Sequence, residues 1–234
     1  MVSASKIKSF DKHVIFTLKE GTYSGKGEMD VSLINRNFTI TSEEVALIDC
    51  FDEDRAFIIA NTSGIFENIN IKDCGLKNEQ GGALHITNSS LSISNCMFEN
   101  NSANMTLGGG AIYASQSMLN ITDSIFLKNV AGLGGAIMLT DLSSLYVKNT
   151  TFDQNNAILN GGAIYMKNIT ATILDSNFTM NNPVYGGAIL TSNTSLSITS
   201  SNFHKNKATE NGGAINVNIN GNIIINDVIY NGNT

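Results

Sequence analysis

The chain has 234 residues, of which 42% are hydrophobic and only 15% charged, and its formal net charge at pH 7 is −6. Its 14 Lys and Arg residues are outnumbered by 20 Asp and Glu residues. Nucleic-acid binding depends on clustered positive charge, so this composition argues against a nucleic-acid partner. Polarity is carried instead by 32 Asn and 42 Ser and Thr residues, a bias typical of turns and outward strand faces.

The N-terminal part contains short apolar runs that predict strands. We assign residues 1–12 to a leader or capping segment, and we expect strands around 13–23, 38–40, 46–48 and 57–59. No basic region followed by a long apolar stretch is present, and no segment approaches the length of a membrane span. We expect one domain over residues 13–234 within a longer protein, with adjoining domains or chains covering its ends and membrane contact only through regions outside this chain.

A four-residue motif, Gly-Gly-Ala followed by Leu or Ile, recurs six times at intervals of 28, 25, 27, 25 and 26 residues. A self-similar period of this size indicates a solenoid, in which each repeat buries its apolar face against its neighbours. The first glycine of each copy is Gly81, Gly109, Gly134, Gly161, Gly186 and Gly212.

A second motif keeps register with the first. In each copy, two apolar residues are spaced by two, as in a strand, and the first of them stands seven residues before a phenylalanine. An asparagine follows three residues after that phenylalanine. The phenylalanines are Phe98, Phe126, Phe152, Phe178 and Phe203, and the asparagines are Asn101, Asn129, Asn155, Asn181 and Asn206.

About 26 residues per repeat leave room for three short strands but not for a helix. We therefore predict an all-β fold, a right-handed single-stranded parallel β-helix of about eight coils, with the usual hand of parallel crossovers. The phenylalanines would form one interior stack. Each asparagine would form a corner that needs a left-handed backbone, with a side chain that pairs along the stack. The residues that follow the Ala-aliphatic pair, such as Tyr165, are expected to point outward.

The alternation of Gly-Gly-Ala-Ile with Phe-x-x-Asn resembles the repeat of chlamydial polymorphic outer membrane proteins, within the pectate-lyase-like β-helix superfamily. The resemblance covers residues 66–234, and the run 13–23 is similar to the entry segment of pectate-lyase-like β-helices. It implies a surface-displayed or secreted β-helix that resembles adhesins, without enzymatic activity. The motif departs from the pattern at both ends, where we align Leu76 and Glu79, and then Ile229 and Gly232, with Phe and Asn.

Asn-x-Ser/Thr sequons offer acceptor sites for N-linked glycans if the chain enters a eukaryotic secretory pathway. The alternative is that they are a by-product of Asn- and Ser-rich turns. Two of the ten, Asn100 and Asn177, lie close to the Phe stack and are expected to be sterically poor. The other candidates are Asn37, Asn61, Asn88, Asn104, Asn120, Asn149, Asn168 and Asn193.

The three cysteines are spaced by about one coil each. Cys74 and Cys96 both align two places before the Phe position, so they either form a disulfide between adjacent coils or serve as small buried residues. Asp49, Asp52 and Asp54 crowd one loop, which is either a weak Ca²⁺ site or a solvated acidic loop. The odd cysteine count and the lack of a Cys-x-x-Cys pair argue against zinc.

No catalytic constellation and no cofactor site is recognisable. The histidines occupy unrelated register positions and most carboxylates are scattered. Asp73, Asp123 and Asp175 share the place three before Phe, but other coils carry Asn or Ser there, which indicates a turn preference. Three hypotheses remain for function. The favoured one is a non-catalytic adhesive or structural solenoid, secreted or at the cell surface, with a surface protein or glycan as ligand. The alternatives are a carbohydrate-active enzyme, a polysaccharide lyase or hydrolase, and a scaffold subunit of a large assembly.

Overall fold

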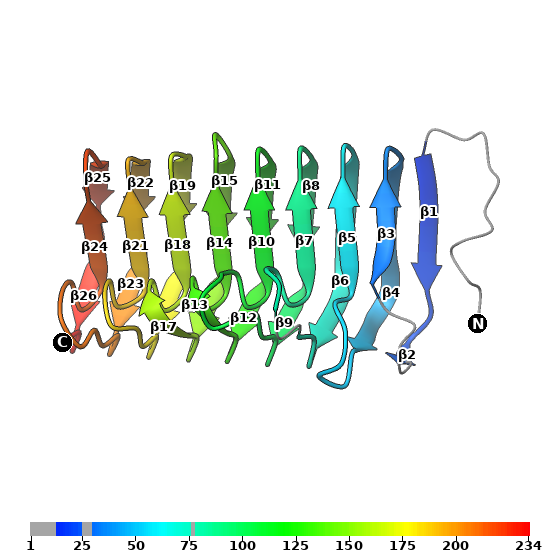
Figure 1. Cartoon of the computed structure of the whole chain (residues 1–234), viewed down its shortest axis with the longest axis horizontal. Coiled ribbons are helices and arrows are strands. Elements are labelled where there is room, and N and C mark those ends of the chain that lie inside the picture. Colours follow the sequence, from blue (N-terminus) through cyan, green and yellow to red (C-terminus); the bar gives the residue numbers. More distant parts are fainter. Residues whose placement is uncertain (1–12, 25–29, 76–77) are drawn as a thin grey trace.

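The computed structural model describes residues 13–24, 30–75 and 78–234, and every regular element in these ranges is a β-strand. All of their strand pairings are parallel. In Figure 1 the strands of the nearer sheet run upward while the chain advances from right to left and returns behind, which makes the solenoid right-handed. The predicted parallel β-helix of about eight coils is confirmed. The leader expected at 1–12 lies outside the described residues.

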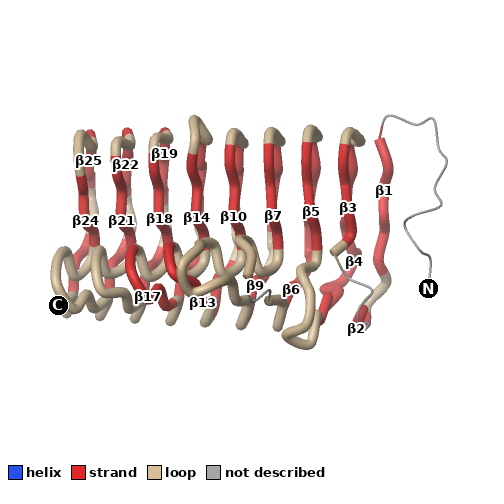
Figure 2. The backbone as a smooth tube through the Cα atoms, in the orientation of Figure 1, coloured by secondary structure: helices blue, strands red, loops and turns tan. Residues whose placement is uncertain are grey.

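Each complete coil contributes strands to three faces. Face 1 is an eight-stranded sheet (Figure 2), and in the repeats each of its strands begins directly after a Gly-Gly-Ala motif. Its strands are β3 (Val31–Ile34), β5 (Phe57–Ala60), β7 (Leu84–Thr87), β10 (Ile112–Ser115), β14 (Ile137–Thr140), β18 (Ile164–Lys167), β21 (Ile189–Ser192) and β24 (Ile215–Asn218).

Faces 2 and 3 are the two branches of one sixteen-stranded sheet, which the long strands β4 (Asn37–Asp49) and β6 (Ser63–Lys72) connect. Face 2 also holds β1 (His13–Leu18), β8 (Ser90–Ser94), β11 (Met118–Thr122), β15 (Ser144–Lys148), β19 (Thr170–Leu174), β22 (Ser195–Thr199) and β25 (Asn222–Asn226). Face 3 also holds β2 (Gly21–Ser24), β9 (Met97–Glu99), β12 (Ile125–Leu127), β16 (Thr151–Asp153), β20 (Asn177–Thr179), β23 (Asn202–His204) and β26 (Ile229–Asn231). A separate parallel pair, β13 (Val130–Leu133) and β17 (Asn156–Asn160), lies on the return from face 3 to face 1.

The predicted phenylalanine stack forms the interior of face 3. Phe126 pairs with Phe152 in register, their ring centroids are 4.9 Å apart, and the rings are within 7° of parallel. All five rings are completely buried. Burying an aromatic side chain contributes about 1.5–3 kcal/mol each, so this stack is a major part of the apolar core.

The asparagines after the phenylalanines form a buried ladder. Asn155 Oδ1 accepts two hydrogen bonds from Asn129, one from the backbone N–H at 3.0 Å and one from the side-chain Nδ2 at 2.9 Å. Asn155 Nδ2 in turn donates to the carbonyl oxygen of Phe126 at 2.9 Å. The same bonds recur from Asn101 to Asn206. The predicted pairing along the stack is confirmed. The left-handed residue, however, is the one before each asparagine, for example Gln154 with φ 54°.

The register corrects the sequence alignment at both ends of the ladder. Ile71 pairs with Phe98, and the N–H of Cys74 donates to Asn101 Oδ1, so these two residues hold the places we assigned to Leu76 and Glu79. Leu76 itself lies outside the described residues. At the C-terminal end Tyr230 stacks on Phe203 and Asn233 continues the ladder, which moves the motif one residue beyond Ile229 and Gly232.

The two glycines of each motif are needed for different reasons. Gly134 has φ 56°, the left-handed region that favours glycine. Gly162 has no such φ, but a Cβ built on it would lie 2.5 Å from the carbonyl oxygen of Gly187 in the next coil. The second glycine therefore permits close stacking of successive coils.

The residues expected to point outward from face 1 are partly covered. Tyr165 is half-buried, as expected for an outer residue, but Met138 is only 8% exposed. A Cβ built on Gly108 would overlap Met138, so the connecting segment at Gly108 lies over this outer position. Such covering depends on loop paths, which a repeat pattern does not encode.

We predict that Gly162→Val destabilises the fold by at least about 3 kcal/mol, because the branched side chain would overlap the backbone of the next coil. Tyr165→Ser, in the neighbouring strand, should cost about 1 kcal/mol. Urea denaturation of both variants measures the difference. Equal losses would show that the stacking face is assigned wrongly.

We also predict that Asn155→Leu costs at least about 3 kcal/mol, since it leaves the Asn129 N–H and the Phe126 carbonyl buried without their partner. The same change at the exposed neighbour, Asn156→Leu, should stay within about 0.5 kcal/mol. Thermal and urea unfolding of the pair tests the ladder, and a tolerant Asn155 position would contradict it.

Candidate functional site

The turn between face 1 and face 2, here called the first corner, carries a row of side-chain amides. Each residue of this amide row has a left-handed backbone, with φ between 45° and 58°. Asn, which tolerates this conformation, is the natural choice. Its members are Asn35, Asn61, Asn88, Gln116, Asn168, Asn193 and Asn220.

A second row stands two residues further along the chain, at the start of each face 2 strand from β6 onward. Five of its seven members carry a hydroxyl group, and successive members pair in register from coil to coil. This outer row consists of Ser63, Ser90, Met118, Ser144, Thr170, Ser195 and Asn222.

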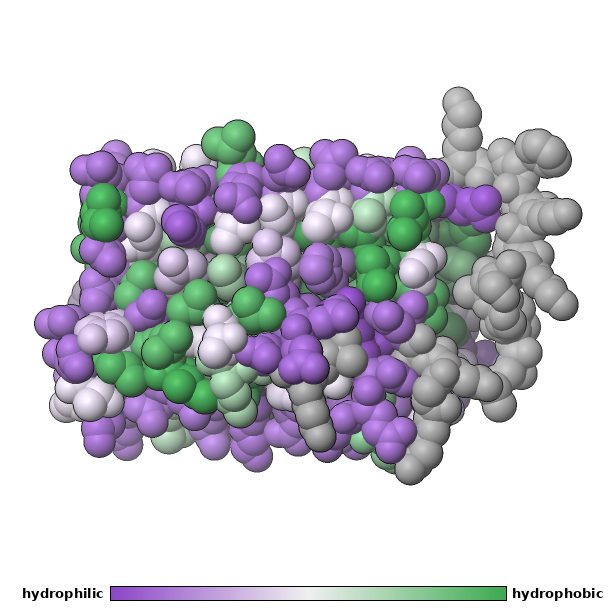
Figure 3. Space-filling view, in the orientation of Figure 1, coloured by the Kyte–Doolittle hydropathy of each residue, from purple (hydrophilic) through white to green (hydrophobic). Residues whose placement is uncertain are grey.

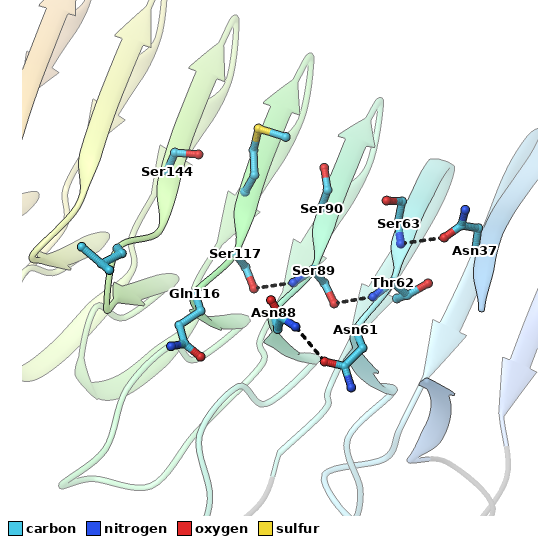
Figure 4. A pocket seen from close by; sticks show the side chains of 12 residues that line it. Asn37, Asn61, Thr62, Ser63, Asn88, Ser89, Ser90, Gln116, Ser117 and Ser144 are labelled. Carbon is cyan, nitrogen blue, oxygen red and sulfur yellow. Dashed lines mark hydrogen bonds between the residues drawn. The ribbon is translucent and has the colours of Figure 1, made fainter. Parts of the chain in front are cut away.

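Between the two rows the backbone is held by buried hydroxyl groups. The N–H of Ser89 donates to Ser117 Oγ at 3.1 Å, and Ser117 Oγ donates back to the carbonyl oxygen of Ser115 at 2.7 Å (Figure 4). Thr62 and Ser143 extend the same arrangement to their neighbours. The corner is therefore fixed from inside, which leaves the amide and outer rows facing outward.

Two hollows follow the first corner along the solenoid. The larger, of about 610 Å³, is lined by Asn61, Asn88, Gln116 and Ser90 among others (Figure 4). The smaller, of about 450 Å³, is lined by Asn168 and Asn193 among others. Leu142, which is 88% exposed, borders both. Charged residues are absent from both linings, which present mostly amide and hydroxyl groups beside Met118, Leu142 and Ile169.

The sequence-predicted sequons are spread unevenly over this surface. Asn61, Asn88, Asn168 and Asn193 are all in the amide row, and Asn37 lines the larger hollow. The remainder lie elsewhere: Asn120 is within β11, Asn149 is in the turn between faces 2 and 3, and Asn104 is in a connecting segment. Asn100 and Asn177, expected to be sterically poor, both have exposed side chains.

The acidic loop does not assemble into a cation site. Asp49 forms a 2.9 Å ion pair with Lys72 and accepts the backbone N–H of Phe51. Neither Asp52 nor Asp54 joins it, and among the described residues no group of three His, Cys, Asp or Glu side chains could hold a metal ion. The hydrogen bonds that Lys72 donates to Asp49 and Asp73 raise the pKa of Lys72, so the cation already present compensates these carboxylates.

A buried arginine that sequence reasoning missed links three N-terminal coils. Arg55 is only 2% exposed, and its guanidinium lies 2.7 Å from Glu79, 3.6 Å from Asp30, and 2.9 Å from the carbonyl oxygen of Gly81. Burial raises the pKa of Asp30, while burial and then the nearby Arg55 lower the pKa of His85. The surrounding carboxylates satisfy the guanidinium, which identifies this cluster as a structural clamp.

Carboxylates do not pair along the strands. The outer positions of face 3, for example, run Lys72, Glu99, Leu127 and Asp153 on successive coils. In the described strands no registered position brings two carboxylates onto adjacent coils.

An apolar patch lies on the opposite side from the first corner. Figure 3 shows hydrophobic residues gathered over β13 and β17, whereas the edge formed by the first corner is largely hydrophilic. Ile158 and Leu159 are each 42% exposed and Met105 is 54% exposed. The two edges of the solenoid thus differ in chemistry.

The described residues contain no helix long and apolar enough to pass through a membrane. This finding agrees with a fold made of short strands.

The predicted Cys74–Cys96 bridge is wrong. Cys74 is joined to Cys50, with their Cα atoms 4.7 Å apart, and Cys96 is free and buried. The error follows from the misplaced Phe position: Cys74 lies at the start of the asparagine ladder, whereas Cys96 occupies the place of Ser124 and its N–H donates to Ser124 Oγ. Cys96 is therefore the small buried residue of the alternative interpretation, and burial raises its pKa to about 11.

We predict that replacing Cys50 and Cys74 together by Ser costs about 3 kcal/mol, because the bridge closes a loop with a sequence separation of 24 residues. Cys96→Ser should cost less than about 1 kcal/mol, since Ser fills this place in neighbouring coils. Denaturant unfolding measures both changes. Thiol titration should detect a single thiol, and only after unfolding; three reactive thiols in the untreated protein would exclude the bridge.

Comparison with known proteins identifies the repeat. Residues 95–115, 149–167 and 200–218 match the Chlamydia polymorphic membrane protein repeat, and each range includes a whole face 3 strand and the Gly-Gly-Ala motif that follows it. The chain is 30% identical over 168 residues to metabotropic glutamate receptor-like protein R of Dictyostelium discoideum, covering 72% of this chain but only 10% of that protein.

Among solved structures, the catalytic domain of a GH87 alpha-1,3-glucanase in complex with nigerose aligns with 92% of this chain and 60% of its own. The TM-score is 0.33 and the identity 12%, too low to support an argument about function. The family match and the observed register together show that the chain carries repeats of the Chlamydia polymorphic membrane protein type within a parallel β-helix.

Proposed function

We propose that this chain is a non-catalytic β-helical segment of a secreted or cell-surface protein, where it serves as an adhesive or structural solenoid. The observation that carries the proposal is that the buried and the outer side chains of a coil have different roles. In the coils that carry the repeat motifs, buried Asn, Ser and Phe side chains fix each coil to the next, while the outer positions differ between coils, as at His85, Tyr113 and Asn216. A rod built in this way can display varied side chains without loss of fold.

Three observations support a location outside the cytosol. The matched repeat family is named for a membrane protein, and the similar Dictyostelium protein is named as receptor-like. The Cys50–Cys74 disulfide is of a kind that persists in oxidising compartments and is rare in the cytosol. The chain spans about a tenth of the length of that relative, which fits a role as one segment of a larger protein.

Repetition suits adhesion. When each coil makes one weak contact, contacts on the same rod act together, so the overall affinity exceeds that of any single coil. Strands paired in parallel along the whole solenoid keep these contacts at a spacing of about 4.8 Å per coil. A rigid array of this kind would also hold neighbouring domains at a fixed distance.

Two measurements test the proposal. Antibodies raised against the chain should label intact cells that produce the protein, and beads coated with the folded chain should be retained on cells or extracellular polymers. The same chain, incubated with acidic and neutral polysaccharides, should release no new reducing or unsaturated ends. The destabilised variant Gly162→Val provides the matched control, because adhesion of the folded solenoid should be lost with the fold.

Labelling only after permeabilisation would contradict the location, and turnover of any polysaccharide would contradict the non-catalytic role. Bead retention that is unchanged in the unfolded control would show that adhesion does not depend on the β-helix.

A further inference from the structure

The sequons of the first corner form a single line. Asn61, Asn88, Asn168 and Asn193 belong to the amide row, and the hydroxyl residue of each sequon belongs to the outer row. We propose that these four asparagines are sites of N-linked glycosylation, so that the first corner is a glycan-bearing edge of the solenoid. This inference deepens the proposed function and rests on the passage through a secretory pathway that it implies.

Turn chemistry alone does not explain the four sequons. The turn between faces 2 and 3 also places asparagines in left-handed conformations, at Asn68 and Asn95, but the residues two positions later are Asn70 and Met97. Only Asn149 in that turn begins a sequon. In the first corner, Met118 follows Gln116 at the same place, so the fold accepts a residue without a hydroxyl there. The Ser and Thr residues are therefore an addition to what the turn requires.

The first corner also has room for the sugar. Asn61, Asn88 and Asn193 are exposed and Asn168 is half-exposed. Asn61 and Asn88 line the larger hollow, and Asn168 and Asn193 line the smaller one. Most residues that line the hollows carry uncharged amide or hydroxyl groups, which can exchange hydrogen bonds with sugar hydroxyls. A glycan at Asn168 would also cover Leu142, an exposed leucine whose burial the fold does not require.

The modification preserves the contacts of the amide row. In the transfer reaction, Asn Nδ2 forms a bond to the first carbon of a lipid-linked oligosaccharide, the lipid pyrophosphate leaves with its electron pair, and Nδ2 loses one proton. The remaining N–H can still donate. Asn88 Nδ2 donates to Asn61 Oδ1 at 2.9 Å and Asn193 Nδ2 donates to Asn168 Oδ1 at 2.9 Å, so each bond needs only that one proton.

The test directs the full chain into the secretory pathway of eukaryotic cells with an added signal sequence. Both secreted and cell-retained protein are digested with an amidase that removes N-glycans in ¹⁸O-labelled water, and the labelled sites are mapped by mass spectrometry. We expect label at Asn61, Asn88, Asn168 and Asn193. Absence of label at all four sites, in folded protein, would overturn the proposal.

A matched variant removes the sequons without touching the amide row: Ser63→Ala, Ser90→Ala, Thr170→Ala and Ser195→Ala together. Its gel mobility should increase by the amount expected for the loss of four glycans. A control with Ser92→Ala and Ser197→Ala, on the outer side of face 2, should keep the mobility of the original chain. Unglycosylated forms of both proteins made in bacteria should melt at the same temperature as the original chain. An unchanged mobility of the fourfold variant would contradict the assignment.

The glycan test and the test of the proposed function can fail separately. The added signal sequence forces entry into the pathway, so glycan mapping reports on the corner itself. Labelling of intact producing cells reports on the natural location, and either result can fail while the other holds.

Discussion

The fold depends on one constraint: equivalent residues of successive coils must lie directly above one another. Asn101, Asn129, Asn155, Asn181 and Asn206 are completely buried, and each donates to the side-chain amide of an asparagine in the next coil and to a backbone carbonyl of the preceding coil. An unpaired buried polar group costs about 1–3 kcal/mol, so a one-residue slip of a single coil would break several such bonds at once. The phenylalanine stack supplies apolar burial, but the polar ladder selects the register.

Where the ladders end, other interactions hold the coils together. The asparagine ladder starts at Cys74, whose N–H meets Asn101, and from that residue the disulfide to Cys50 continues toward the N-terminus. Lys72 adds ion pairs on either side, to Asp49 and Asp73. The close glycine stacking similarly ends at Gly82. In the coil before it, Arg55 aligns with Gly82 and donates to the Gly81 carbonyl. Specific bonds thus replace repetition at the N-terminal end.

Sequence reasoning recovers what repeats and misses what occurs once. The phenylalanine stack, the asparagine pairing and the glycine corner follow from residues that return every coil. The last Phe and Asn positions were predicted one residue too early, at Ile229 and Gly232 instead of Tyr230 and Asn233, because the last coil is longer than the mean period. The predicted cysteine pairing failed because an ordinary aliphatic residue, Ile71, holds the first Phe position. Leu142 and Arg55 each act at a single point, so no period marks them. The first corner was visible only as scattered sequons until the register aligned them.

The scarcity of charge follows from the same stacking. Two like charges on adjacent coils, about 5 Å apart near the surface, repel by about 3 kcal/mol, and a charged position repeated in every coil would add this cost repeatedly. On the outer side of face 3, accordingly, Lys72 lies beside the opposite charge of Glu99, and Leu127 separates Glu99 from Asp153. Asn149 likewise stands between Asp123 and Asp175 and donates to Asp123 at 2.7 Å. A solenoid in exact register must therefore present mostly amides and hydroxyls. Such a surface offers many neutral hydrogen-bonding groups, and the glycans that we propose for the first corner would extend that chemistry beyond the reach of its side chains.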